Sequence, residues 1–503
     1  MSEIVLARQV LYLSESWQVW YNTERFRNGE MDMVGRKEEL LALERAMRSD
    51  ESQFVAVYGR RRVGKTYLVR EALGREFIFE HVGPYDGSYE EELDAFRDSL
   101  VKWGVQDCPQ IKTWKEAFLL LEKFVAASRK RRKVIFIDEL PWMDTPKSKF
   151  LPALGHFWNA FASARKDVVL VVCGSAASWM LKKIVQDKGG LHDRVTDIIY
   201  LKPFDLSECE QYSRQKGLKM SRREIAECYM VFGGVPYYWS YLDKRYSLIQ
   251  NIDRLCFAEG GKLTKEFSRL YASLFKDDER YRQIVRTLST VRIGMSRDEL
   301  IREMKVSDGG AWTHCLDDLC ESGFVRKYTS VGKKSKGAIY QLVDNFTLFH
   351  FQFMEGLVNA DEQFWTLAQK SQRVVVWKGL AFERLCLAHV RQIKAALGIS
   401  GVLTNVFSWR HEPDDTYPWG AQIDLLLERA DNVINVCEMK YAKGEFVIKA
   451  DYEKDLNRKC ETFAAVTGSK SAVHLTLITT EGLAHNSHSG VVQSEVILDD
   501  LFK

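Results

Sequence analysis

The residues best suited to chemistry begin with a glycine-rich loop. The segment GRRRVGKT, residues 59–66, has the spacing GxxxxGK[ST] and lies between an apolar stretch at 54–58 and an amphipathic stretch at 66–73. A strand before this motif and a helix after it let backbone N–H groups and a helix N-terminus bind phosphates. Lys65 would reach the β- and γ-phosphates of ATP, and the Thr66 hydroxyl would ligate Mg²⁺. The residues expected around the nucleotide here are Gly59, Arg60, Arg61, Arg62, Val63, Gly64, Lys65, Thr66 and Tyr67.

Two further stretches end in residues that suit the same reaction. The apolar run at 134–137 is followed by Asp138 and Glu139. Asp138 would hold Mg²⁺, and Glu139 would orient or deprotonate the attacking water. The apolar run at 168–173 leads to Ser175, which would sense the γ-phosphate, although an ordinary serine at a strand end explains it equally well.

Near the C-terminus, carboxylates and a lysine occur at hairpin spacing. Two apolar stretches surround Asp431, and a turn symmetric about it sets Asp424 opposite Glu438, since each is seven residues from the centre. Glu438 and Lys440 then share one face of their strand. Glu383, in an expected helix upstream, is a plausible third carboxylate.

This grouping indicates metal-dependent phosphate chemistry. Two carboxylates can hold Mg²⁺, and the metal together with Lys440 can generate hydroxide and stabilise a pentavalent phosphate. A bare ExK on a strand is usually a charged surface pair, but an Asp at hairpin spacing within apolar strands favours a nuclease-like site. The metal ligands expected over the whole chain are Thr66, Asp138, Glu383, Asp424 and Glu438.

The elements that position these residues fall into distinct patterns. Short apolar strands alternate with amphipathic helices up to Pro203, which predicts a parallel α/β sheet. Helices dominate the next stretch, and residues 281–346 read as three helices and a hairpin, the pattern of a winged helix. Its tip, with Lys333, Lys334 and Lys336, could contact DNA phosphates. A packing role is equally open, because the third helix carries three acidic residues: Asp317, Asp318 and Glu321.

Length and composition set the outer limits. A chain of 503 residues with 46% hydrophobic and 28% charged residues has material for several packed domains. The formal charge of +3 excludes a polybasic coat, so any DNA contact must come from local patches. The apolar runs are of strand length, and the N-terminus lacks a signal-peptide core, so we expect no membrane association and a cytoplasmic location.

Five motifs in order resemble a known family. VGRKEEL, GRRRVGKT, IFIDEL, CGS and FGGVPYYW together resemble the prokaryotic "archaeal ATPase" family of AAA+- and STAND-like P-loop proteins. The resemblance implies that Gly35 and Arg36 lie on the base side of the nucleotide. It also implies that Arg194 faces a phosphate, either in its own chain or in a neighbour of a homo-oligomer. An ion pair with Asp193 or Asp197 is the structural alternative for Arg194.

The C-terminal residues resemble a second pattern. Glu383, Asp424, Glu438 and Lys440 are similar to the PD-(D/E)XK nuclease pattern, which the C-terminal domain of the family is thought to follow. The departure is Ile423, which stands where a proline often precedes the aspartate.

We therefore expect a multidomain α/β protein. The expected parts are an N-terminal extension (1–30), a P-loop ATPase core with a parallel sheet (31–204), a helical lid (205–278), a winged helix (279–346), a helical connector (347–372) and a PD-(D/E)XK nuclease-like α/β domain (373–503). The expected function is a Mg²⁺-dependent ATPase whose nucleotide state controls a nuclease-like domain acting on DNA. The alternatives are a STAND-type signalling switch that oligomerises without cleaving, and a winged-helix DNA-binding regulator.

Overall fold

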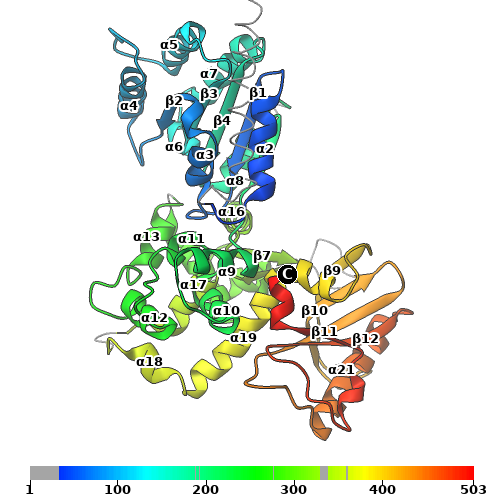
Figure 1. Cartoon of the computed structure of the whole chain (residues 1–503). Coiled ribbons are helices and arrows are strands. Elements are labelled where there is room, and N and C mark those ends of the chain that lie inside the picture. Colours follow the sequence, from blue (N-terminus) through cyan, green and yellow to red (C-terminus); the bar gives the residue numbers. More distant parts are fainter. Residues whose placement is uncertain (1–32, 187–188, 192, 276, 329–337, 358–360) are drawn as a thin grey trace, which may run out of the picture.

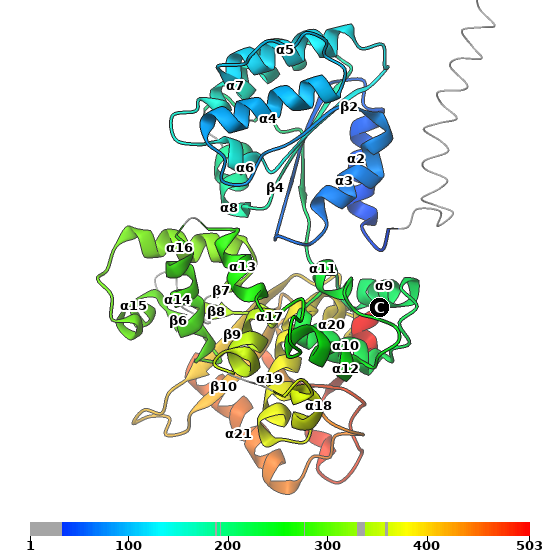
Figure 2. The same ribbon diagram turned by 90° about the vertical axis from the view of Figure 1, so that its left-hand side faces the viewer.

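Figure 1 shows the chain as a computed structural model, and Figure 2 shows the same fold turned by 90°. The structure describes residues 33–186, 189–191, 193–275, 277–328, 338–357 and 361–503. The expected extension at 1–30 and the three wing-tip lysines, Lys333, Lys334 and Lys336, lie outside these residues. No helix among the described residues is both long and apolar enough to cross a membrane.

The N-terminal body is a five-stranded parallel sheet, the upper part of Figure 1. The strands are β1 (Gln53–Tyr58), β2 (Phe77–Val82), β3 (Lys133–Asp138), β4 (Val168–Gly174) and β5 (Asp197–Tyr200), in the spatial order β2-β3-β4-β1-β5. Every pair of neighbouring strands is parallel. The continuous apolar runs of β3 and β4 are fully buried, as is usual for strands covered on both faces. The predicted parallel α/β core is confirmed.

Helices cover both faces of this sheet, as Figure 2 shows. One face packs against α2 (Lys37–Arg48) and α3 (Lys65–Leu73), and the other against α4 (Tyr89–Lys102), α5 (Trp114–Ala127) and α7 (Phe150–His156). Alternate residues of β1 belong to the two layers: Val55 and Val57 to the first, Phe54 and Ala56 to the second. This is the period of two expected of a strand buried on both sides.

Helices follow the core as predicted. They are α9 (Leu206–Gln215), α10 (Arg222–Phe232), α11 (Pro236–Trp239), α12 (Leu248–Cys256) and α13 (Glu266–Ala272). Capping boxes begin three of them, with Asp205, Ser221 and Ser247 as the N-caps. Such caps satisfy backbone N–H groups that the helix leaves free and so fix where each helix starts.

The next part, residues 278–342, has the predicted order of three helices and a hairpin; we call it the hairpin unit. Its elements are α14 (Asp278–Ser289), β6 (Met295–Ser296), α15 (Arg297–Met304), α16 (Gly310–Glu321), β7 (Val325–Tyr328) and β8 (Ile339–Leu342). The three short strands form a sheet in the order β6-β8-β7.

The C-terminal part is a second α/β layer, at the lower right of Figure 1. It follows α17 (Asn345–Phe349) and α18 (Phe364–Ala368) and contains α19 (Gln372–Ala388), α20 (Val390–Ala396), β9 (Thr404–His411), β10 (Ala421–Arg429), β11 (Val433–Lys440), α21 (Ala450–Thr467), β12 (Ala472–Thr479) and β13 (Ser494–Ile497). The strand order is β13-β12-β11-β10-β9. Strands β10 and β11 form an antiparallel hairpin, whereas β11 and β12 are parallel and are joined through α21.

The helical segment, the hairpin unit and the C-terminal part share one hydrophobic core. A single cluster runs from Leu206 through Leu316 and Trp377 to Leu425 and Cys437. The parts separated by sequence pattern are therefore packed as one lower body. Among the described residues, the parallel-sheet core has two hydrophobic clusters of its own, and a smaller cluster lies between α21 and the C-terminal sheet.

Three consecutive arginines of the glycine-rich loop join the two bodies. Arg60 pairs with Asp344, which follows β8, and both side chains are buried. Arg62 pairs with Glu266 of α13, and Arg61 Nη1 donates to the Ser273 carbonyl at 2.8 Å. The loop expected to bind phosphate is thus also the main polar contact to the lower body.

Removing Asp344 should destabilise this junction, because the buried Arg60 guanidinium would lose its counter-ion. We expect Asp344→Ala to lower the free energy of unfolding by about 3–5 kcal/mol, measured by urea denaturation. Asp344 also caps α17 by accepting from Thr347 N at 2.8 Å, so Asp344→Asn, which can keep the cap, separates the two effects.

The matched control is Asp455→Ala, which removes an exposed ion pair with Arg458 at 2.5 Å. Exposed pairs contribute at most about 1 kcal/mol. Equal losses in Asp344→Ala and Asp455→Ala would contradict the importance of the buried pair.

Candidate functional site

The glycine-rich loop follows β1 and leads into α3, as the motif requires. Gly59 and Gly64 both have positive φ, at 144° and 93°. A Cβ on Gly59 would lie 2.3 Å from the Leu201 carbonyl oxygen, so only glycine fits there. Lys65 is buried, and its Nζ donates to the carbonyls of Gly59 and Arg60 at 3.0 Å each. The ammonium group is therefore held inside the loop by the loop's own backbone.

The ligands expected for Mg²⁺ lie together at the carboxyl edge of the sheet. Thr66 Oγ1 donates to Asp138 Oδ2 at 2.6 Å, and Asp138 Oδ1 accepts from Glu139 N at 2.9 Å. A hydroxyl and a carboxylate in contact are the oxygen donors that Mg²⁺ prefers. This donor set fits a magnesium ion shared with nucleotide phosphates.

Glu139 and Ser175 are paired, although they lie 36 residues apart. Glu139 Oε2 accepts from Ser175 Oγ at 2.8 Å and from Ser175 N at 3.2 Å. Glu139 itself has a positive φ of 51°, an uncommon backbone conformation for this residue type. Ser175 thus orients the carboxylate that is expected to activate water.

Gly35 and Arg36 lie beside the glycine-rich loop. Arg36 Nη2 donates to the Val63 carbonyl at 3.4 Å, and its guanidinium lies 4.7 Å from the centre of the Phe204 ring. Burial lowers the pKa of Arg36, opposed by the charge of Glu208. Gly35 approaches the Glu208 side chain so closely that a Cβ would lie 2.0 Å from Oε1. This segment therefore connects the loop to α9.

Four expected nucleotide residues sit differently from the prediction. The side chains of Arg60, Arg61 and Arg62 bind the lower body, so only their backbone remains to contact a phosphate. Arg194 is exposed in the turn before β5. Thr196, two residues further on, bonds to Phe54 at the start of β1, whereas the phosphate loop follows the end of β1. Arg194 thus lies near the edge of the sheet opposite the phosphate loop.

The hairpin register in the C-terminal part agrees with the prediction. Leu425 pairs with Cys437 and Leu426 with Val436, so the same register sets Asp424 opposite Glu438. Asn432, with φ of 64°, closes the turn.

Glu438 is surrounded by cations. Its carboxylate contacts Lys440 Nζ at 2.8 Å and Lys459 Nζ at 2.6 Å, and it accepts from the Tyr452 hydroxyl at 2.8 Å. Burial works against the charged form, but Lys459 and Lys440 outweigh it and bring the pKa of Glu438 down to about 2. Tyr452 and Lys459 lie seven residues apart on one face of α21, a spacing that could have been noticed in the sequence.

Glu383 and Asp424 share a different cation. Arg292, from the loop between α14 and β6, places Nη2 2.6 Å from Glu383 Oε2 and 2.7 Å from Asp424 Oδ2. Burial and the charge of Asp424 raise the pKa of Glu383 to about 7, against the effect of Arg292. Gln422 Nε2 also donates to Asp424 Oδ1 at 2.6 Å. Sequence pattern gives no sign of Arg292, which is 132 residues from Asp424.

The three carboxylates expected to hold a metal are paired with basic side chains in the structure. Within the residues that the structure describes, no three His, Cys, Asp or Glu side chains are grouped so as to hold a metal ion. Glu383, Asp424 and Glu438 are near enough for their charges to interact, but each is paired with a basic side chain. Carboxylate oxygens suit a divalent metal ion, but the basic side chains paired with them do not leave room for its charge.

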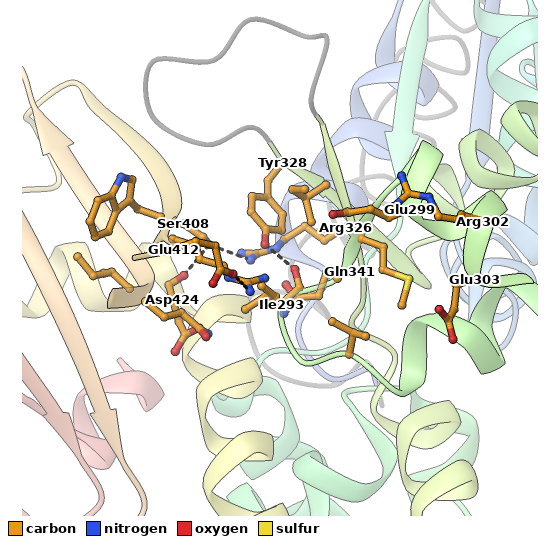
Figure 3. Close-up of a pocket in the computed structure, with 18 residues that line it drawn as sticks. Ile293, Glu299, Arg302, Glu303, Arg326, Tyr328, Gln341, Ser408, Glu412 and Asp424 are labelled. Carbon is orange, nitrogen blue, oxygen red and sulfur yellow. Dashed lines mark hydrogen bonds and ion pairs between the residues drawn. The ribbon is translucent and has the colours of Figure 1, made fainter. Parts of the chain in front are cut away.

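A cavity of about 500 Å³ adjoins this site, between the hairpin unit and strands β9 and β10 (Figure 3). Asp424 lies on one side of it and Arg302 on the other. Arg326 crosses between them and donates to Ser408 Oγ at 3.1 Å, with its guanidinium 4.6 Å from the Tyr328 ring centre. Burial lowers the pKa of Arg326. The walls of the cavity thus come from the hairpin unit and from the C-terminal sheet.

Comparison with known proteins supports nucleotide binding by the N-terminal body. Residues 33–242 match a family described as an ATPase domain found predominantly in Archaea. The N-terminal part of the chain belongs to this ATPase family. An uncharacterized ATP-binding protein of Methanocaldococcus jannaschii, MJ0423, is 47% identical over 50 residues, which are 10% of this chain and 85% of that protein. The uncharacterized protein MJECL04 of the same organism is 24% identical over 84% of this chain and 94% of its own length, so the match extends past the ATPase domain.

Two solved structures are similar to part of the chain. The Walker-type ATPase PABY2304 of Pyrococcus abyssi is 15% identical with a TM-score of 0.46. The match covers 64% of this chain and 96% of that one. The ORC2 protein of Aeropyrum pernix, solved as ADPNP–ADP complexes, has 16% identity, a TM-score of 0.39, and coverage of 63% and 93%.

Lys65→Ala should weaken ATP binding to the ATPase domain, because the ammonium can leave the loop carbonyls and bond to phosphate oxygens. Loss of charge-assisted hydrogen bonds predicts a Kd about 10- to 100-fold higher, measured by titration with a fluorescent ATP analogue. Lys102→Ala, at an exposed position on α4, is the control and should leave the Kd unchanged.

Glu139→Gln should retain nucleotide binding and lose turnover, because the amide cannot accept a proton from water. We expect phosphate release to fall about 10²- to 10⁴-fold. Glu71→Gln, at an exposed position on α3, should hydrolyse ATP at the wild-type rate. Full turnover by the Glu139 variant would remove this carboxylate from the reaction.

Proposed function

We propose that ATP binding and Mg²⁺-dependent hydrolysis in the ATPase domain control a C-terminal, metal-dependent, nuclease-like domain that acts on DNA. The observation that carries this proposal is the buried ion pair between Arg60 of the phosphate loop and Asp344, which lies two residues beyond the hairpin unit. A nucleotide in that loop brings negative charge beside Arg60. The electrostatic balance of the junction therefore depends on nucleotide state.

Contacts within the lower body support transmission from Asp344 to the C-terminal site. Asp344 follows β8, and Gln341 in that strand donates from Nε2 to the Arg292 carbonyl at 2.7 Å. Arg292 in turn reaches Glu383 and Asp424. A shift of the hairpin unit would thus change the contacts of Arg292 with Glu383 and Asp424.

The nuclease-like assignment is supported by the hairpin that opposes Asp424 and Glu438, with Glu383 and Lys440 beside them. Glu383, Asp424 and Glu438 would hold the metal, which when bound supplies a polarised water and stabilises charge on phosphate. Lys440 would then turn from Glu438 toward a phosphate oxygen.

DNA would approach on the side of the cavity rather than along α16. That helix is engaged in the fold: Asp318 pairs with Lys182 of the ATPase domain at 3.4 Å and accepts from the Tyr281 hydroxyl at 2.7 Å. A regulator that reads the major groove with α16 is therefore the weaker alternative.

The second candidate function is a signalling switch that oligomerises without cleaving DNA. It is favoured by the pairing of Glu438 with two lysines, which leaves that carboxylate without a free oxygen. In such an assembly the exposed Arg194 would act on the phosphate of a neighbouring copy.

Asp424→Ala and Lys440→Ala should each abolish nicking of supercoiled DNA by the full chain with Mn²⁺ and ATP, because the first removes a metal ligand and the second a cation for the phosphate. The measurement is conversion of supercoiled plasmid to open circles on a gel, and we expect at least a 100-fold lower rate (about 2.7 kcal/mol).

Glu428→Ala is the matched control, since this acidic residue lies on the same strand but bonds to Asn405 Nδ2 at 3.0 Å. It should nick at the wild-type rate. Equal nicking by all three variants would contradict the nuclease proposal and favour the signalling switch.

A further inference from the structure

Arg292 reaches the carboxylate site from a different part of the molecule. It belongs to the hairpin unit, in the loop between α14 and β6, and its side chain is half-exposed. One atom, Nη2, lies 2.6 Å from Glu383 and 2.7 Å from Asp424. A guanidinium bridging two carboxylates takes the place in which oxygen ligands would otherwise meet a cation.

Every carboxylate of the site has a basic partner without any added ion. The three carboxylates of Glu383, Asp424 and Glu438 face three basic side chains, those of Arg292, Lys440 and Lys459. A divalent cation entering this arrangement would meet no uncompensated negative charge and would lie against the guanidinium. Like charges at such short range are strongly unfavourable in a partly buried site.

We propose that Arg292 is a built-in competitor of the metal, so that the carboxylate site binds a divalent cation only when the hairpin unit withdraws this arginine. This inference rests on the proposed nuclease-like function and adds its regulation.

The backbone of the loop that carries Arg292 is hydrogen-bonded to the hairpin unit. Tyr328 donates its hydroxyl to the Ile293 carbonyl at 2.6 Å, and Gln341 donates to the Arg292 carbonyl at 2.7 Å. Gly294, with φ of 83°, passes so close to β8 that a Cβ would lie 2.2 Å from the Tyr340 carbonyl oxygen. The backbone at Arg292 is therefore tied to β7 and β8.

The hairpin unit ends near the phosphate loop. Asp344, two residues beyond β8, pairs with Arg60, and Lys182 of the ATPase domain pairs with Asp318 of α16. A rearrangement of the phosphate loop that displaces Asp344 would act on the chain directly after β8, the strand whose Gln341 binds the Arg292 carbonyl. The competitor is thus placed where nucleotide state can remove it.

The test is a titration of the nucleotide-free full chain with Mn²⁺, in which electron paramagnetic resonance measures the Mn²⁺ that remains free. Arg292→Ala and Arg292→Gln should each bind Mn²⁺ at least about tenfold more tightly than the wild type, because a positive charge leaves the site. Arg292→Gln keeps a hydrogen-bond donor and guards against loss of folding in the alanine variant. The added binding should disappear when Asp424→Asn is combined with Arg292→Gln.

Arg286→Ala is the matched control, because this arginine lies on α14 and pairs with the distant Glu355 at 2.6 Å. It should leave Mn²⁺ affinity unchanged. If Asp424→Asn weakens Mn²⁺ binding but the Arg292 variants match the wild type, the competitor role is overturned and the metal site stands. If no variant shows Mn²⁺ binding that depends on Asp424, the proposed metal site fails, and the competitor with it.

Discussion

The buried ion pair between Arg60 and Asp344 is the constraint on which the arrangement of the two bodies depends. Burying one charge without its partner is strongly destabilising. The phosphate loop and the chain just beyond β8 must therefore stay in contact. Arg60 also lies 4.7 Å from the Phe324 ring centre, which ties the same group to the core of the lower body. The side chains of three consecutive arginines thus hold the nucleotide-binding loop to the lower body.

How far the sequence predicts this molecule depends on the chain distance between interacting residues. The phosphate loop and the hairpin of Asp424 and Glu438 were predictable because strand, turn and helix signals are local. The pairing of Arg60 with Asp344 spans 284 residues, and that of Arg292 with Asp424 spans 132. Periodicity carries no information about such pairs, which arise only when separate elements pack. The arginines of the loop were therefore assigned to phosphate, although their side chains serve the junction.

The two sites show opposite relations between charge and ligand. At the phosphate loop, Lys65 is held by neutral carbonyls, which a phosphate can replace without leaving a charge unpaired. At the C-terminal site, every carboxylate already has a cationic partner, so a ligand must displace a charge to enter. The first site is prepared for its ligand, and the second is protected from it. A nucleotide-controlled activity needs this order, since the first event must be able to occur alone.

The parallel pairing of β11 and β12 has its own consequence for how the C-terminal site is built. Parallel neighbours require a crossover, and here α21 is that crossover, so the helix that topology demands also delivers Tyr452 and Lys459 to Glu438. The turn at 430–432 lies at the far end of the hairpin from Asp424. Extra residues could be inserted in that turn without moving a charged group of the site, whereas one extra residue inside α21 between Tyr452 and Lys459 would place these two side chains on different faces of the helix. Length variation is thus compatible with the site on one side of β11 and not on the other.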